Sequence, residues 1–487
     1  MPLSASKKKV LFIIHDLHQN DVWFPMGPAY LAAMLFKNGA QIETYCMDVY
    51  HYTNEDLAKF LDENEYQLIC LGFMAARFKR TVRELCYVIC RHKKNAWLVL
   101  GGYGPSSIPE FMLPETGADI VVAGEAEYTI LDLLNCKINK LNHSDVNGIA
   151  FLKNGRLIKT PPARIFRNLD ELPLPLWEAF PMEHYTTCLK YFDQEPGEKV
   201  FFIETSRGCT AKCNFCDRLS TKTTMRLRSI ENIISEFQVL HHRYGVTCFL
   251  FLDELFIVNR GRLTKLAAAL KNIGLRFKFS TNVRSDTINE ERIRLLKECG
   301  CNFLNFGFES TDDNVLQLMS KGTTNKQNVA AVEAALRVSG MGIGTNFLWN
   351  NFGDNQSSLL SNQEFIKRYN TYHQCRTIEP AIPYPGSPLY YDLIRKGLLK
   401  DAADFFERFL NQSLIVTNLM ENISTETAHL MLFETNSNLV RHHYRLADKN
   451  PEIAKYLIKN YHDLYTGKTT EFKGARHLDK EPSLAMA

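Results

Sequence analysis

The residues best suited to chemistry in this chain are three cysteines in the run Arg207-Gly208-Cys209-Thr210-Ala211-Lys212-Cys213-Asn214-Phe215-Cys216. Their spacing is C-x3-C-x2-C, and they come directly after the apolar stretch 200–205. Thiolates are soft ligands that suit iron-sulfur clusters and zinc. Since three ligands from one loop leave one corner of the metal centre open, the motif predicts a reactive metal site.

A structural zinc site is the main alternative for these cysteines. Such sites close with four ligands, usually as paired C-x2-C units, and the chain has no second C-x2-C pair. Two other interpretations remain: a zinc site with a fourth ligand from elsewhere in the chain, or three cysteines in a polar turn that bind no metal. Most of the other cysteines fall in apolar strand or helix patterns, which predicts small core residues.

The spacing, with the aromatic Phe215 before the third cysteine, resembles the signature of the radical S-adenosylmethionine (SAM) enzymes. The resemblance implies that Cys209, Cys213 and Cys216 are the metal ligands of a 4Fe-4S cluster. It also implies that the amino and carboxylate groups of SAM bind the open iron, and that Phe215 contacts the adenine.

Composition indicates a large enzyme of more than one domain. The chain has 487 residues, 45% of them hydrophobic and 23% charged, which is enough apolar material for two cores. A net charge of +3 gives no reason to expect a nucleic-acid partner. No secretory segment and no run of membrane-spanning length is found, so we expect a cytoplasmic protein with its 13 cysteines reduced.

Before the cysteines, short apolar runs alternate with helix-like segments. The expected strands are 10–14, 42–46, 68–73, 97–100 and 120–122, and the expected helices are 30–37, 54–63, 80–92 and 127–134. This alternation predicts a doubly wound parallel sheet, whose ligands bind at the carboxyl ends of the strands. Glycine-bearing turns stand there at 72–77, 101–105 and 124–127, and glycine lets the backbone approach a large ligand closely.

The order of three features resembles the cobalamin-binding domain that precedes the radical SAM domain in one large subfamily: Pro25-Met26-Gly27, the turn at 101–102 and the turn at 124–127. The segment 168–175 resembles the subfamily's connecting segment. The cofactor-binding residues implied are Met74, Arg77, Gly101, Gly102, Gly104, Gly124 and Glu125. The D-x-H-x-x-G pattern that supplies a histidine to cobalt in many such domains is missing. The lower ligand of cobalt would then be His15, His18 or no protein residue. A domain of this fold that binds no cobalamin also remains an alternative.

After the cysteines the alternation resumes. The expected strands are 200–205, 247–252, 277–281, 303–308, 342–348 and 376–378, and the helices between them are 230–244, 262–272, 290–299, 325–339 and 362–372. Six repeats predict a partial (β/α)6 barrel, as in the radical SAM family. We therefore expect a cobalamin-binding-like Rossmann domain (1–140), a linker (141–195), the barrel (196–396), and a helical region with a polar tail (397–487), with helices at 398–410, 426–447 and 451–465.

Polar residues recur at the carboxyl ends of these strands, which predicts a shared reaction chamber. They are Asp253, Glu254, Asn282, Arg284, Glu309, Asn346 and Glu379. Segments 252–256, 307–310 and 383–390 resemble the D-[DE]-x-F, G-x-E-S and barrel-closing P-x-P-G-[ST]-P-L elements of the subfamily. We assign Asp253 and Glu254 to catalysis, and Arg284, Glu309, Asn282 and Asn346 to SAM. The G-G-E pattern of other branches is missing, so the acceptor for the SAM amino group stays open.

The resemblance implies a cobalamin-dependent radical SAM methyltransferase that acts on an unactivated carbon, or on a phosphinate phosphorus, in natural-product or lipid biosynthesis. Its partners would be a small-molecule substrate and a one-electron reductant such as flavodoxin or ferredoxin, with no nucleic acid and no membrane span. A cyclase or rearrangement enzyme with the same cofactors, and a non-catalytic corrinoid or iron-sulfur sensor, remain alternatives. No motif predicts the substrate.

Overall fold

The computed structural model describes residues 8–16, 22–189, 194–217, 224–256, 259–371, 374–446 and 451–468. His18 and the predicted polar tail after 468 lie outside the described residues. The chain divides into two compact units, Met1–Leu189 with Asp217–Arg228, and Lys190–Cys216 with Ser229–Ala487. Across the described ranges, no helix is long and apolar enough to cross a membrane.

The first unit contains a seven-stranded sheet of order β2-β1-β3-β4-β5-β6-β7. Its strands are β1 (Lys9–Ile14), β2 (Gln41–Cys46), β3 (Leu68–Gly72), β4 (Trp97–Gly101), β5 (Ile120–Val122), β6 (Ile149–Lys153) and β7 (Arg156–Lys159). The first five pair in parallel, which confirms the predicted doubly wound sheet. The antiparallel hairpin β6–β7 extends the sheet with residues that we expected in a linker.

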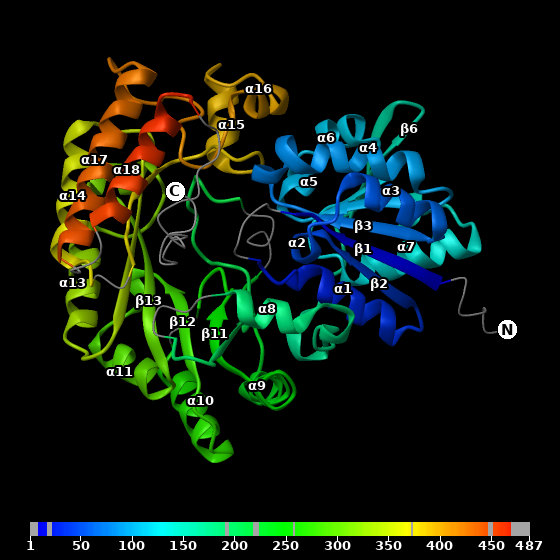
Figure 1. Ribbon diagram of the computed structural model, residues 1–487, viewed down its shortest axis with the longest axis horizontal. Coiled ribbons are helices and arrows are strands. Elements are labelled where there is room, and N and C mark those ends of the chain that lie inside the picture. The colour runs from blue at the N-terminus through cyan, green and yellow to red at the C-terminus, as the bar shows by residue number, and fades with distance from the viewer. Residues whose placement is uncertain are drawn as a thin grey trace. The chain divides into compact units, whose positions relative to one another are not determined.

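Helices cover both faces of this sheet (Figure 1). On one face lie α1 (Met26–Lys37) and α7 (Glu127–Asn139), which share a core with Val10 and Phe12 of β1. On the other face lie α3 (Asn54–Glu63), α4 (Arg83–His92) and α6 (Pro109–Thr116). Because both faces are covered, β1 is apolar at almost every position rather than at alternate ones.

One expected helix of this unit begins differently from the prediction. Residues 80–92 do not form a single α-helix, because a π-helical turn, η3 (Phe78–Val82), precedes α4. A short 3-10 helix, η2 (Ala75–Arg77), comes directly before it. Such turns change the direction of the chain without ending it, and here they bend the segment after β3 across the carboxyl end of the sheet.

The second unit contains six parallel strands in chain order, which confirms the predicted partial barrel. They are β8 (Lys199–Ile203), β11 (Val246–Phe251), β12 (Lys278–Val283), β13 (Cys301–Glu309), β14 (Gly342–Trp349) and β15 (Ile378–Pro380). The connecting helices are α9 (Ile230–Tyr244), α10 (Arg260–Ile273), α11 (Glu290–Glu298), α12 (Asp313–Leu318), α13 (Asn325–Leu336) and α14 (Gln356–Tyr369). β15 begins two residues later than predicted, so Glu379 lies inside the strand rather than at its end.

The two faces of the second sheet differ in polarity. Phe249 and Phe251 of β11 pack with Phe237 of α9, and Phe251 stacks on Phe279 of β12 with ring centroids 4.4 Å apart. This aromatic layer joins the strands to the helices outside the barrel. Since side chains alternate along a strand, Asn282, three residues after Phe279, lies on the inner face.

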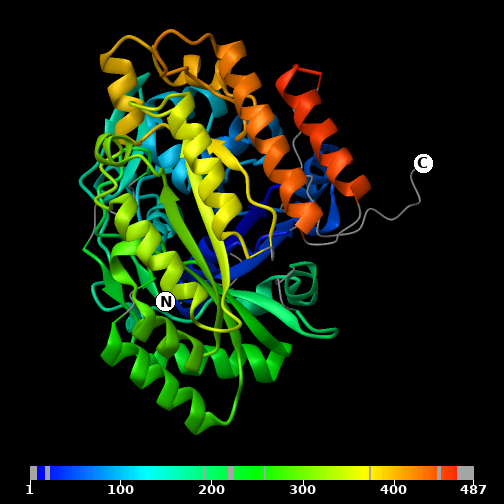
Figure 2. The ribbon, with the colours of Figure 1, turned by 90° about the vertical axis from the view of Figure 1, so that its left-hand side faces the viewer.

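Four helices follow β15: α15 (Pro388–Arg395), α16 (Ala402–Arg408), α17 (Thr425–Leu446) and α18 (Pro451–Tyr465). Of these, α17 packs against the edge strand β15. Figure 2 shows α17 between α14 and α18. The Asn436 side-chain amide donates to the carbonyl of Ile378 and accepts from its N–H, both at 2.9 Å. The amide thus satisfies backbone groups that an open sheet edge would leave unpaired.

Candidate functional site

The loop with the three cysteines follows β8 and has no regular helix or strand between Gly208 and Cys213. Cys213 is buried, Cys209 is partly buried and Cys216 is exposed. The Cys209 sulfur accepts from the N–H of Ala211 at 3.5 Å, which suits a thiolate. Burial raises the pKa of the Cys213 thiol, although the nearby Lys321 ammonium acts in the opposite direction.

Asn214, between the second and third cysteines, fixes this loop to three other segments. Its N–H donates to the carbonyl of Met319 at 2.8 Å, and its side-chain amide donates to the carbonyl of Leu318 at 3.1 Å. Its side-chain oxygen accepts from Asn351, after β14, at 3.3 Å. Its carbonyl accepts from the N–H of Leu389 in the first turn of α15 at 2.8 Å. The motif did not predict this role for Asn214, because its partners lie more than 100 residues away in the sequence.

Leu389 lies in the segment 383–390, which resembles the barrel-closing element. The segment leads into α15, whose N-cap Ser387 accepts from the N–H of Tyr390. The bond from Leu389 to Asn214 therefore joins this segment directly to the loop that carries the cysteines.

Asp253, predicted to be catalytic, binds the backbone just before the cysteine loop. Its carboxylate accepts from the N–H groups of Thr205 at 2.6 Å and Ser206 at 3.2 Å, and from the Thr205 hydroxyl. Burial raises its pKa to about 6. The carboxylate thus stabilises the chain where β8 turns into the cysteine loop. Its neighbour Glu254 is exposed.

Glu309 and Lys321 form a buried ion pair beside the cysteine loop. Lys321 Nζ lies 2.8 Å from Glu309 Oε1 and 6.0 Å from the centre of the Phe215 ring. Glu309 has a φ of 66°, in the left-handed region, and the pairing of β13 with β14 shifts register between Gly307 and Glu309. Strained backbone and bulges in a sheet occur preferentially at functional sites. Lys321 was missed because its sequence neighbourhood, a turn after α12, is common.

Arg284 lies in the same region. Its guanidinium binds both oxygens of the Asp286 carboxylate at 3.0 Å and the Lys321 carbonyl at 2.8 Å. Burial lowers the pKa of Arg284, but the Asp286 carboxylate and the Cys213 and Cys209 thiols act against it, and the net effect is a raised pKa. The structure thus brings Arg284, Glu309, Phe215 and the cysteines together, with Lys321 between them.

Three thiols on one loop form a donor set that fits an iron-sulfur cluster. Within the described ranges, no three or more histidine, cysteine or acidic side chains converge on one ion. Each cysteine of a 4Fe-4S cluster binds a different iron, so its sulfurs need not converge on one point. A loop fixed by Asn214, with one thiol buried and one exposed, meets this requirement.

In the first unit, the predicted glycines have two different roles. A Cβ on Gly102 would lie 2.9 Å from the carbonyl oxygen of Phe73, and one on Gly104 would lie 2.9 Å from the N–H of Ala75. These glycines allow the turn after β4 to pack against the segment after β3. A Cβ on Gly101 or Gly124 would meet nothing within 4 Å. Packing therefore does not require glycine at these two positions.

Glu125, predicted to bind cofactor, pairs with Arg226 of the same unit. The guanidinium binds both carboxylate oxygens, one of them at 3.1 Å, and also donates to the Phe166 carbonyl at 2.6 Å. Both side chains of this pair are largely buried. The pair fixes the segment 224–228 to the first unit.

His15 directly follows β1 and is a buried imidazole with both ring nitrogens unpartnered among the described residues. Burial, followed by the charge of Arg77, lowers its pKa to about 4, so the ring is neutral at pH 7. A neutral imidazole without a partner is available to a hydrogen-bonding group or a metal ion. Met74 is 57% exposed, so the segment after β3 presents a flexible apolar side chain at the surface. These features fit a corrinoid at this edge.

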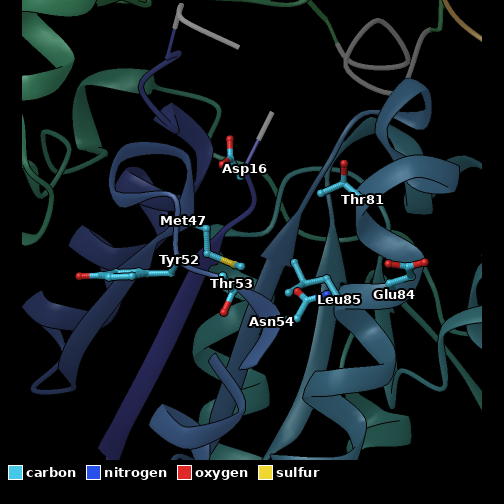
Figure 3. A pocket seen from close by; sticks show the side chains of 8 residues that line it. All are labelled: Asp16, Met47, Tyr52, Thr53, Asn54, Thr81, Glu84 and Leu85. Atoms are coloured by element: carbon cyan, nitrogen blue, oxygen red, sulfur yellow. The ribbon is translucent and has the colours of Figure 1, made fainter. Parts of the chain in front are cut away.

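A cavity of about 160 Å³ lies near the ends of β1 and β2 (Figure 3). Its lining side chains are Asp16, Met47, Tyr52, Thr53, Asn54, Thr81, Glu84 and Leu85. The cavity is too small for a corrin ring, and none of the predicted cofactor-binding residues lines it.

Comparison with known proteins agrees with this geometry. Residues 203–360 match the Radical SAM superfamily, and residues 18–134 match the B12 binding domain. An uncharacterized methyltransferase of Pyrococcus horikoshii is 27% identical over 388 residues, covering 77% of this chain and 79% of that protein. Cytidylyl-2-hydroxyethylphosphonate methyltransferase of Streptomyces wedmorensis is 23% identical over 451 residues, covering 82% and 83%.

A solved structure has the same fold over most of the chain. The radical SAM methyltransferase TsrM from Kitasatospora setae, with cobalamin and a 4Fe-4S cluster bound, matches with a TM-score of 0.64 and 16% identity, covering 80% of this chain and 75% of that one. The radical SAM domain implies a 4Fe-4S cluster and SAM as cofactors, and the B12 binding domain implies cobalamin. The chain is therefore an enzyme of the radical SAM superfamily with an N-terminal B12-binding domain, similar to the cobalamin-dependent methyltransferases.

Proposed function

We propose that this enzyme transfers a methyl group from SAM, by way of cobalamin, to an unactivated carbon or a phosphinate phosphorus of a small molecule in natural-product or lipid biosynthesis. The observation that carries the proposal is the combination in one chain of the cysteine loop, the half-barrel and a B12-binding domain. The relative that methylates a cytidylyl-2-hydroxyethylphosphonate supports a small-molecule substrate. When bound, the reduced cluster supplies an electron for cleavage of SAM to a 5'-deoxyadenosyl radical, and cobalamin supplies the methyl group.

The residues of the chain would then position and shield these groups. Cys209, Cys213 and Cys216 hold the cluster, and Asn214 fixes their loop. The buried Lys321 ammonium, next to Phe215, is placed to bind the SAM carboxylate. An external one-electron donor such as flavodoxin or ferredoxin completes the system.

The test is anaerobic reconstitution with iron, sulfide and cobalamin, followed by metal analysis and incubation with methyl-labelled SAM and a reductant. We expect four irons and one cobalt per chain, 5'-deoxyadenosine, and label in the corrinoid fraction. The Cys209/Cys213/Cys216→Ala variant is the control and should lose the absorbance near 400 nm together with SAM cleavage. Four irons without cobalt would refute the cobalamin role and favour cyclisation or rearrangement. A triple variant that still cleaves SAM would refute the cluster assignment.

A further inference from the structure

Four polar side chains form a continuous chain of hydrogen bonds across the inner face of the half-barrel. Arg376, before β15, donates to Asn346 Oδ1 of β14 at 2.9 Å. Asn346 donates to Asn305 Oδ1 of β13 at 3.0 Å, and Asn305 donates to Asn282 Oδ1 of β12 at 2.8 Å. Every bond has its donor on the side of β15 and its acceptor on the side of β12.

The direction of this chain follows from which groups can only donate or only accept. A guanidinium has no acceptor, so the oxygen of Asn346 must face Arg376. The NH2 group of Asn346 also donates to the backbone carbonyl of Phe306 at 3.1 Å, and a carbonyl can only accept. Asn305 must then offer its oxygen to Asn346 and its NH2 to Asn282. Asn282, the last amide in this series of hydrogen bonds, therefore accepts with its oxygen and keeps its NH2 group free to donate.

The surroundings of Arg376 hold the first donor in place. Its guanidinium is buried and also donates to Gln374 at 2.6 Å. A Cβ on Gly344 would lie 2.2 Å from one guanidinium nitrogen, so only glycine at this position of β14 leaves room for it. Hydrogen bonds in series polarise one another, and a cation at the donor end strengthens the donor at the other end.

The free NH2 group of Asn282 faces the interior of the half-barrel. The Asn282 side chain is exposed, and its NH2 group has no partner in the ranges that the structure describes. Asn282 lies two residues before Arg284, which follows the end of β12 and donates to the carbonyl of Lys321 at 2.8 Å. The Lys321 ammonium in turn lies 6.0 Å from the centre of the Phe215 ring in the cysteine loop. The donor is therefore close to the cysteine loop, where SAM binds in the proposed function.

We propose that Asn282 donates a hydrogen bond to an oxygen of SAM, and that Arg376, Asn346 and Asn305 are positioning residues that fix its amide in the donating orientation. This inference rests on the proposed SAM-dependent function and adds a division of roles within it. Asn346 uses both ends of its amide within the chain of hydrogen bonds, so it orients Asn305. Among these four side chains, Asn282 is the exposed one, and its NH2 group has no partner in the described part of the chain.

The experiment measures the dissociation constant of SAM for the reconstituted enzyme without reductant, so that SAM is not cleaved. Asn282→Leu removes one hydrogen bond to the ligand and should weaken binding by about tenfold. Asn282→Asp keeps the shape but turns an oxygen toward the SAM oxygen, so it should weaken binding more than leucine does. If Asn282 had a purely structural role, Asn282→Leu would weaken SAM binding more than Asn282→Asp, because aspartate keeps the shape of asparagine.

Asn305→Asp tests the positioning role without changing Asn282. The introduced carboxylate can accept from Asn346 but cannot donate to Asn282, so Asn282 should turn its amide over, donate to that carboxylate and present its oxygen to SAM. Binding should again weaken by about tenfold. The matched control is Asn289→Asp, at the N-cap of α11, where aspartate accepts the N–H of Arg292 equally well.

The outcomes separate this inference from the proposed function. Wild-type enzyme that binds no SAM would overturn the proposed function. If the wild type binds SAM and Asn282→Asp binds it equally well, only the donor role of Asn282 is wrong. If Asn282→Asp is weakened and Asn305→Asp is not, the fixed orientation of the chain is wrong.

Discussion

Replacing Lys321 with methionine should destabilise the second unit strongly, because it leaves a buried carboxylate without its partner. The side chains of Glu309 and Lys321 are only 10% and 7% exposed. Glu309 also has a φ of 66°, a conformation that costs roughly 1–3 kcal/mol and needs support from its surroundings. A Cβ on Gly307 would lie 2.6 Å from Glu309 Oε1, so the pair packs directly over the strand backbone.

The expected loss follows from the burial of the pair. Removing one partner of a buried ion pair typically costs roughly 3–5 kcal/mol, since the remaining charge keeps its desolvation penalty and loses its compensation. At roughly 2–4 °C per kcal/mol for a unit of this size, the melting temperature should fall by on the order of 10 °C. Lys321→Met combined with Glu309→Gln removes the charge and should recover at least half of the loss.

Anaerobic scanning calorimetry of protein without reconstituted cofactors measures this change, with the two units allowed separate transitions. Lys326→Met is the matched control, because Lys326 is an exposed lysine on α13 and its replacement should change stability by less than about 0.5 kcal/mol. The view that a buried charge pair stabilises this part of the site would be refuted by either of two results. One is a decrease of less than about 1 kcal/mol in the free energy of unfolding for Lys321→Met, and the other is a double variant whose free energy of unfolding is no higher than that of Lys321→Met.

Three further predictions concern other polar groups. Burial raises the pKa of Asp48 to about 7, and its partner is the Tyr185 hydroxyl at 2.8 Å. Because the native state keeps this proton to a higher pH than the unfolded chain, urea titrations should show the stability of wild type relative to Asp48→Asn falling by roughly 2 kcal/mol from pH 5 to pH 7. A pH-independent difference would contradict this. Asn214→Leu removes two side-chain hydrogen bonds that hold the cysteine loop. A chelator should therefore remove iron from the reconstituted variant several-fold faster than from wild type or from the control Thr210→Val. Equal rates would show that Asn214 does not hold the cysteine loop in place. His15→Leu removes both ring nitrogens and should weaken cobalamin binding about tenfold in a spectroscopic titration, and unchanged affinity would exclude a contact with His15.

The architecture of both units could be predicted from the sequence, because it depends on patterns that repeat locally. Apolar runs of strand length separated by helical segments predict parallel sheets in both halves, and most of the predicted strands lie within a residue or two of the observed ones. The exceptions lack that signal. β6 and β7 are short, partly polar strands, and the turn before α4 differs from an α-helix only in its hydrogen-bonding pattern.

The sequence by itself determined the cysteine loop, the two domain types and the cofactors they imply, because three ligands within eight residues and glycines at strand ends are local features. Only the tertiary structure decided which polar residues share a site. Lys321 reaches Glu309, Asn214 reaches Asn351, and Arg376 connects to Asn282 through two other strands. Parallel strands connected by helices bring together residues that lie tens of residues apart in sequence, so such pairings depend on register and side-chain direction. Those quantities are fixed when the core packs, and a single sequence does not display them.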